Sequence, residues 1–182
     1  MIVIHPYDKT TQFLKPLYGA SENLHLCTEQ DSNAEIRRVL NHVAQPDSPV
    51  MMLGHGCEYG LFAPVSPAEP FGRLIVNGTH VEFLRKLTCF AIWCNANLFA
   101  EKYNLHGIFS GMIISELEEA DWCGVQTTPE ELECENNRLT ALLKDAFLNC
   151  PSLADIPDYI KNHAPMDTPL QQFNYNNIYY YS

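Results

Sequence analysis

Two reactive side chains each follow directly on a short apolar run that is typical of a buried strand. His55 comes after the run Val50 to Gly54, and Cys94 comes after the run Thr88 to Trp93. An imidazole beside a thiol can accept its proton and later return a proton to a leaving group, as acyl transfer by a cysteine nucleophile requires. The sequence therefore predicts Cys94 as a nucleophile and His55 as its general base and acid.

These two residues depend on the elements that precede them. Short apolar runs alternate with amphipathic stretches through the first two thirds of the chain, which is typical of βα units that form a mostly parallel sheet. Ligands and catalysts of such sheets lie at the carboxyl ends of the strands, where both residues are expected. We predict an α/β fold with a doubly wound, mostly parallel sheet and helices on both faces. A helix that begins behind Cys94 is expected to lower the pKa of its thiol.

The individual elements are predicted from apolar spacing and from turn and cap residues. A helix with its cap among residues 31–33 carries an apolar stripe, and another begins at Thr128 with Pro129 at its first position and Glu131 completing a capping box. The acidic stretch from Ser115 to Asp121 is interpreted as a solvated helix face. The remaining predictions are strands at 2–4, 24–28, 50–53, 88–93 and 107–114, a turn of helix shortened by Pro16, a hairpin or extended excursion within 58–78, a short helix after it and a helix at 95–103.

The last residues differ in composition from the rest. Four prolines follow Cys150, and the chain ends in a tyrosine-rich segment, which together favour an irregular tail or an edge strand. No internal repeat or low-complexity linker divides the chain. We therefore expect one domain over residues 1–182, with its core at about 1–150 and an irregular tail at 151–182.

Two segments resemble the two motifs of the caspase-like superfamily of cysteine peptidases. They are VMMLGHG at Val50 to Gly56 and CFAIWCNA at Cys89 to Ala96. Caspases, gingipains, separase and bacterial CHAT domains belong to that superfamily. The resemblance implies a three-layer caspase-like fold, a His55–Cys94 dyad, an oxyanion hole that includes the backbone N–H of Gly56, and a peptide or protein substrate. It implies no metal and no organic cofactor, and it gives Gly54 a role in backbone geometry.

One residue departs from the family pattern and keeps other functions open. The family usually has a small or acidic residue before the cysteine, whereas this chain has Trp93. A catalytically inactive caspase-like domain is the alternative, and it would bind another protein through Trp93 and the tyrosine-rich tail. A third possibility is a different doubly wound domain in which the two motifs coincide by chance.

Composition excludes some partners. The 182 residues include 22 acidic and 11 basic ones, a net charge of −11 that repels nucleic acid and anionic lipid. No apolar run is long enough to cross a bilayer, and the first residues lack the features of a signal peptide, so a cytoplasmic location is expected. The sequence leaves the oligomeric state open.

Cysteine usage indicates reduced thiols. The seven cysteines form an odd count without the spacing of a disulfide framework or a zinc ribbon. Cys57 could join His55 and Cys94 as a metal ligand, but that spacing fits no common zinc pattern, so no metal site is predicted. Four cysteines are expected to be small core residues: Cys27, Cys89, Cys134 and Cys150.

Overall fold

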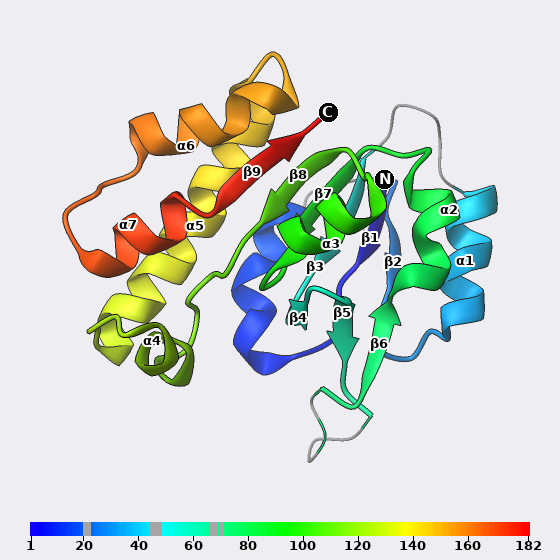
Figure 1. Ribbon diagram of the computed structural model, residues 1–182, viewed down its shortest axis with the longest axis horizontal. Coiled ribbons are helices and arrows are strands. Elements are labelled where there is room, and N and C mark those ends of the chain that lie inside the picture. Colours follow the sequence, from blue (N-terminus) through cyan, green and yellow to red (C-terminus); the bar gives the residue numbers. More distant parts are fainter. Residues whose placement is uncertain (20–22, 44–48, 66–68, 70) are drawn as a thin grey trace.

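The computed structural model describes residues 1–19, 23–43, 49–65, 69 and 71–182. Its centre is a six-stranded sheet in the order β2-β1-β3-β7-β8-β9 (Figure 1). Neighbouring strands from β2 to β8 are parallel, and β9 pairs antiparallel with β8 at the edge. The strands are β1 (Ile2–Ile4), β2 (His25–Cys27), β3 (Val50–Leu53), β7 (Cys89–Ile92), β8 (Gly107–Ser110) and β9 (Ile178–Tyr181). The predicted α/β class and mostly parallel sheet are confirmed, although the strand expected at 107–114 ends at Ser110.

Helices cover both faces of this sheet, because successive strand residues point to opposite sides. Ile2 and Ile4 pack on one face and Val3 on the other. The first face carries α1 (Asn33–His42), α2 (Val81–Leu84) and α3 (Ala96–Tyr103), and the second carries the 3-10 helix η1 (Lys9–Leu17), α5 (Pro129–Asn149), α6 (Ile156–His163) and α7 (Pro169–Tyr175). The molecule therefore has three layers.

Local sequence explains where several helices begin. Ser32 caps α1 in a capping box with Glu35, within the range expected from the sequence. Thr128 caps α5 and Pro129 occupies its first turn, as predicted. The capping box predicted for Glu131 is wrong, because its carboxylate accepts a hydrogen bond from the Thr127 hydroxyl.

A small antiparallel sheet stands between β3 and β7 in the chain. Its strands are β4 (Gly56–Cys57), β5 (Gly60–Ala63) and β6 (Arg73–Val76), followed by the 3-10 turn η2 (Gly78–His80). The predicted excursion is confirmed as a set of short strands, and residues 66–68 and 70 within it lie outside the described part. Buried side chains of β5 and β6 join the core on the α1 and α3 face.

The C-terminal residues correct the predicted irregular tail. They form the 3-10 turn η3 (Leu153–Asp155), α6, α7 and the predicted edge strand β9. Pro157 and Pro169, which suggested irregularity, stand in the first turns of α6 and α7, where a proline costs no hydrogen bond. The side chains of Ile156, Ile160, Leu170, Tyr175 and Ile178 are all buried. The tail is therefore part of the core.

The cysteines agree only in part with their predicted roles. All seven are free, and Cys27 and Cys89 are buried as expected. Cys150 is half-buried, and the core role predicted for Cys134 is wrong, because it lies on the solvent face of α5. Within the described residues, no helix has the length and apolarity needed to cross a membrane.

A buried hydrogen bond from α7 to α5 anchors the C-terminal elements and gives a first prediction. The Tyr175 hydroxyl donates to Glu135 Oε2 at 2.7 Å, and Gln171 Nε2 donates to the other oxygen at 2.9 Å. Tyr175→Phe should lower the free energy of unfolding by about 1.5–3 kcal/mol, since it removes a hydrogen bond to a buried carboxylate. Urea unfolding measures the change. Tyr180→Phe, at an exposed position of β9, is the control, and equal stability of the two variants would contradict the anchoring role.

Candidate functional site

His55 and Cys94 emerge at the same edge of the main sheet. Strands β3 and β7 are adjacent and parallel, with Leu53 paired to Ile92. Gly54 follows β3 with φ +142°, a conformation that strongly favours glycine, and its N–H donates to the Ile92 carbonyl at 3.1 Å. The chain then turns into β4 after presenting the imidazole. The strand order therefore delivers both predicted residues to neighbouring positions.

Cys94 stands on a sharp turn between β7 and α3. Asn95 adopts the left-handed conformation with φ 65°, which asparagine tolerates better than most residues, and α3 begins at Ala96. The half-buried thiol lies 3.4 Å from the Ile113 carbonyl and 3.6 Å from Glu119 Oε1, and it can donate to either. No hydrogen bond joins it to His55 among the described residues.

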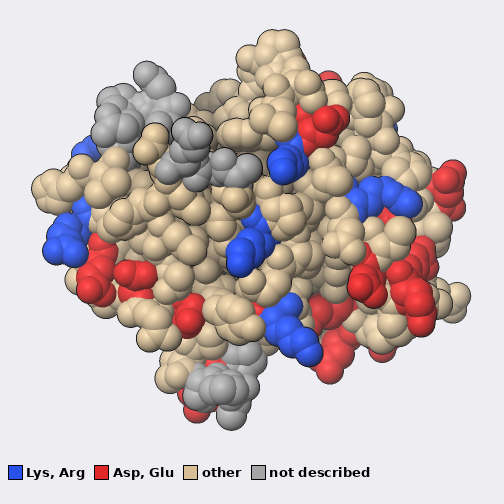
Figure 2. Space-filling view, turned by 180° about the vertical axis from the view of Figure 1, so that it is seen from behind, with Lys and Arg blue, Asp and Glu red and all other residues tan. Residues whose placement is uncertain are grey.

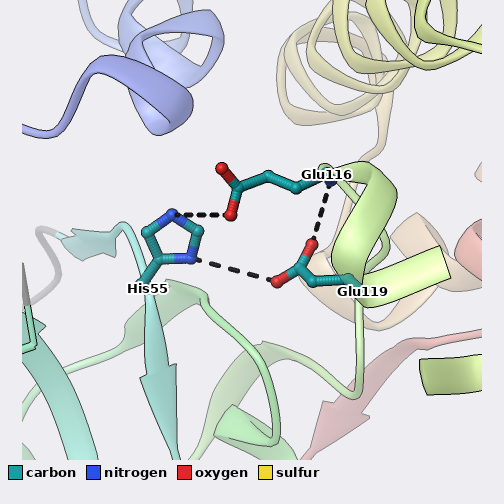
Figure 3. Close-up of side chains that lie close together, drawn as sticks. All are labelled: His55, Glu116 and Glu119. Carbon is teal, nitrogen blue, oxygen red and sulfur yellow. Dashed lines mark hydrogen bonds and ion pairs between the residues drawn. The ribbon is translucent and has the colours of Figure 1, made fainter. Parts of the chain in front are cut away.

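Glu119 lies between the two predicted catalytic groups. It comes from α4 (Leu117–Cys123), and its Oε2 accepts hydrogen bonds from Ser115 N, Ser115 Oγ and Glu116 N at 2.7, 3.0 and 3.1 Å. Its other oxygen, Oε1, faces Cys94 and lies 4.0 Å from His55 Nδ1 (Figure 3). The interpretation of Ser115 to Asp121 as a solvated face is wrong for this residue, whose side chain is only 8% exposed.

The environment of Cys94 disfavours its thiolate. Burial and the adjacent Glu119 carboxylate raise the pKa of the Cys94 thiol to about 12. The N-terminus of α3 begins two residues after Cys94, yet the pKa is not lowered as expected from the sequence, because desolvation and a like charge outweigh the helix dipole. In this arrangement the thiol is protonated at neutral pH.

Thr10 sets the tautomer of His55. Its Oγ1 lies 2.7 Å from His55 Nε2 and donates its own proton to Asp8 Oδ1 at 2.8 Å. Since a hydroxyl has a single proton, Nε2 must carry the hydrogen of that contact, which leaves the lone pair of a neutral ring on Nδ1. Nδ1 is the nitrogen that faces Glu119, the residue in contact with Cys94.

Glu116 approaches the same imidazole from the start of α4. Its Oε2 lies 3.8 Å from His55 Nε2, and its side chain is 34% exposed. Burial raises the pKa of the Glu116 carboxyl. The nearby charges of Glu119 and Asp8 raise it further, whereas His55 lowers it without reversing the shift. One ligand atom from each of His55, Glu116 and Glu119 lies within 4.8 Å of the others, so these residues could hold a metal ion.

His55 separates two spaces of very different size. A cavity of about 800 Å³, within the size range of ligand sites, lies on the side of Thr10 and Glu116. Its wall includes Phe71, whose ring meets the imidazole edge-on with centroids 5.4 Å apart. On the other side, a space of about 20 Å³ contains Cys94 and has room for little more than a water-sized group. A peptide that fills the large cavity reaches His55 before it reaches the thiol.

Trp93 points into the core. Its side chain is 1% exposed, packs edge-on against Phe99, and donates from Nε1 to the Cys57 carbonyl at 3.1 Å. A methyl group at Gly56 would stand 2.2 Å from Trp93 Cδ1 and 2.6 Å from the Gly60 carbonyl oxygen. Gly56 is therefore required for packing, while its role in an oxyanion hole stays a prediction.

The site contains three residues that sequence reasoning did not nominate: Thr10, Glu116 and Glu119. Thr10 follows β1, and the two glutamates follow β8, so all three leave the sheet at the edge that also presents His55 and Cys94. Ser115 to Asp121 follows the strand after Cys94, so the rule applied to His55 also pointed to this stretch. Its acidic composition, which is typical of a solvated helix, obscured that position.

Comparison with known proteins does not assign the chain to a family. No model of a known protein family matches the chain, and no curated protein is significantly similar to it. Assignment of a function therefore rests on the site itself.

The contact between Gly56 and Trp93 gives a prediction for stability. Gly56→Ala should lower the free energy of unfolding by about 1–3 kcal/mol, because the added methyl group overlaps the indole ring and a backbone oxygen. Thermal and urea unfolding measure the change. Trp93→Leu should lower the free energy of unfolding less in the Gly56→Ala background than in the native chain, because the smaller leucine leaves room for the added methyl group. Strictly additive losses would contradict the packing role of Gly56.

The contact between Glu119 and Cys94 gives a prediction for reactivity. Glu119→Gln removes the adjacent negative charge, so the pKa of the Cys94 thiol should fall and its alkylation by iodoacetamide at neutral pH should accelerate about tenfold. Mass spectrometry of the peptide that contains Cys94 measures the rate. Glu118→Gln, one residue away and exposed, is the control and should change nothing. Equal rates in both variants would exclude Glu119 as the cause.

Proposed function

We propose that this chain is a cysteine hydrolase of the caspase-like type that acts on peptide bonds and stands here in a resting arrangement. Cys94 is the nucleophile and His55 is its general base and acid. The observation that carries the proposal is the position of both residues after adjacent parallel strands, with the free nitrogen of His55 facing the carboxylate that the thiol contacts.

The arrangement of elements supports the caspase-like resemblance. The motif that ends in His55-Gly56 follows β3, and the motif that ends in Cys94 follows β7, its neighbour in the sheet. A small antiparallel sheet and a short helix fill the chain between them, where the resemblance leaves room for an excursion and a helix. The cavity of about 800 Å³ that adjoins His55 is large enough for part of a peptide.

In the proposed reaction the Cys94 proton moves to His55 Nδ1, and the sulfur bonds to the scissile carbonyl carbon. The N–H of Gly56 stabilises the oxyanion, and His55 returns the proton to the departing amine as the C–N bond breaks. Water then hydrolyses the thioester and restores the thiol. Glu119 must first withdraw from Cys94, because its charge opposes formation of the thiolate.

A specific observation favours the second candidate, a catalytically inactive domain that binds another protein. The raised pKa of Cys94 and the space of about 20 Å³ beside it both suit a residue with no nucleophilic role. Trp93, which the sequence suggested as part of the contact surface, is buried and cannot contribute to it. Tyr179 and Tyr180 of β9 remain exposed and available for contacts.

A peptide-library cleavage assay separates the two candidates. We expect the native chain to cleave a subset of peptides, Glu119→Gln to cleave faster, and Cys94→Ala and His55→Gln to cleave none. His55→Gln is preferred to alanine because it removes the base without opening a path from the large cavity to the thiol. His42→Gln, at an exposed position in α1, is the matched control. If neither the native chain nor any variant cleaves a peptide, and Cys94 is alkylated no faster than the other thiols, the hydrolase is rejected. The catalytically inactive binding domain is then the supported candidate.

A further inference from the structure

The carboxylates of Glu116 and Glu119 face one imidazole without a permanent positive charge to balance them. Among the described residues, neither carboxylate lies within ion-pair distance of a lysine or arginine, and His55 is the partner of both. Figure 2 shows acidic side chains gathered toward the end of the molecule that carries α4 and the start of α5, where Glu118, Asp121, Glu130 and Glu133 are exposed. The local field therefore attracts cations.

The three side chains have the chemistry and the spacing of a metal site. One ligand atom from each residue lies within 4.8 Å of the others; Glu119 Oε1 lies 4.0 Å from His55 Nδ1, whereas Glu116 Oε2 lies 3.8 Å from the other nitrogen, Nε2. Ligand atoms around one zinc ion stand about 3.3 Å apart, given bonds of about 2.0–2.2 Å. Figure 3 shows the two carboxylates at different nitrogens of the ring, so the partly exposed Glu116 side chain must swing toward Nδ1 to share one ion with Glu119.

Neighbouring groups already orient these ligands as metal sites require. His55 donates from Nε2 to Thr10 Oγ1, which in turn donates to Asp8, so the lone pair on Nδ1 is turned toward Glu119. Glu119 has three donors on Oε2, which hold its side chain while Oε1 stays turned toward the imidazole and Cys94. Such supporting hydrogen bonds fix the tautomer and direction of metal ligands.

We propose that His55, Glu116 and Glu119 bind one divalent transition-metal ion of the zinc class. An imidazole with two carboxylates suits zinc, whereas magnesium and calcium prefer sets made of oxygen alone. Three protein ligands leave a coordination position open for water or another small group. The Cys94 thiol, 3.6 Å from Glu119 Oε1, stands next to this site without being needed for it.

The ion has a consequence for the hydrolase that rests on the function proposed above. It occupies the lone pair of His55 that receives the thiol proton, and it holds Glu119 in place beside Cys94. Zinc binding therefore stabilises the resting arrangement and inhibits cleavage.

Calorimetric titration of the metal-free full-length chain with Zn²⁺ tests the site without reference to catalysis. We expect one strong site per chain, with affinity at least about tenfold weaker in Glu119→Gln, Glu116→Gln and His55→Gln. Glu118→Gln and His42→Gln should bind as the native chain does. Every one of these variants keeps all seven thiols, so any zinc held by cysteines is the same in each and cancels in the comparison.

Two outcomes would overturn the metal site. Equal zinc affinity in Glu119→Gln and Glu118→Gln would exclude this set of ligands, and equal binding of Mg²⁺ by the native chain would exclude the zinc class. Circular dichroism checks that each variant is folded, and Glu116→Gln serves if Glu119→Gln is not, because the Glu116 side chain is partly exposed. Failure of the metal-free native chain to cleave any peptide, although it binds zinc as expected, would reject the hydrolase alone.

Discussion

The parallel pairing of β3 with β7 is the constraint on which the site depends. The pairing aligns Leu53 with Ile92, so the segments that follow the two strands leave the sheet at one edge and turn away within two residues. Both turns use a positive φ angle, at Gly54 after β3 and at Asn95 after Cys94. The buried strands beneath are closely packed, and the imidazole and thiol consequently line one small space, with no hydrogen bond between them among the described residues.

One carboxylate lies next to both members of this pair. Three donors at the start of α4 fix one oxygen of Glu119, and the other oxygen is left for Cys94 and His55. Burial raises the pKa of the Cys94 thiol, and the Glu119 charge raises it further and favours a cation near the imidazole. The proposed catalysis and the proposed metal binding therefore make opposed demands on Glu119. The resting arrangement is favoured whenever Glu119 stays in place.

His55 also divides the space around the site. The large cavity and the small space beside Cys94 share this residue in their walls, so the imidazole stands between the cavity and the proposed nucleophile. Glu116 is the more exposed of the two glutamates and lines the cavity. The start of α4 therefore contributes both to the wall of the cavity and to the charge beside the imidazole.

The sequence by itself determined the class of fold, the positions of most strands along the chain and the edge at which His55 and Cys94 lie, because apolar periodicity and cap residues act locally. It failed where distant segments decide the outcome. Burial of Glu119 and Trp93, the helices of the last 30 or so residues and the raised pKa of Cys94 all arise from contacts between elements far apart in the chain. Only the tertiary structure fixes desolvation and the charges that surround each group, and these set what a thiol, a carboxylate or an imidazole can do.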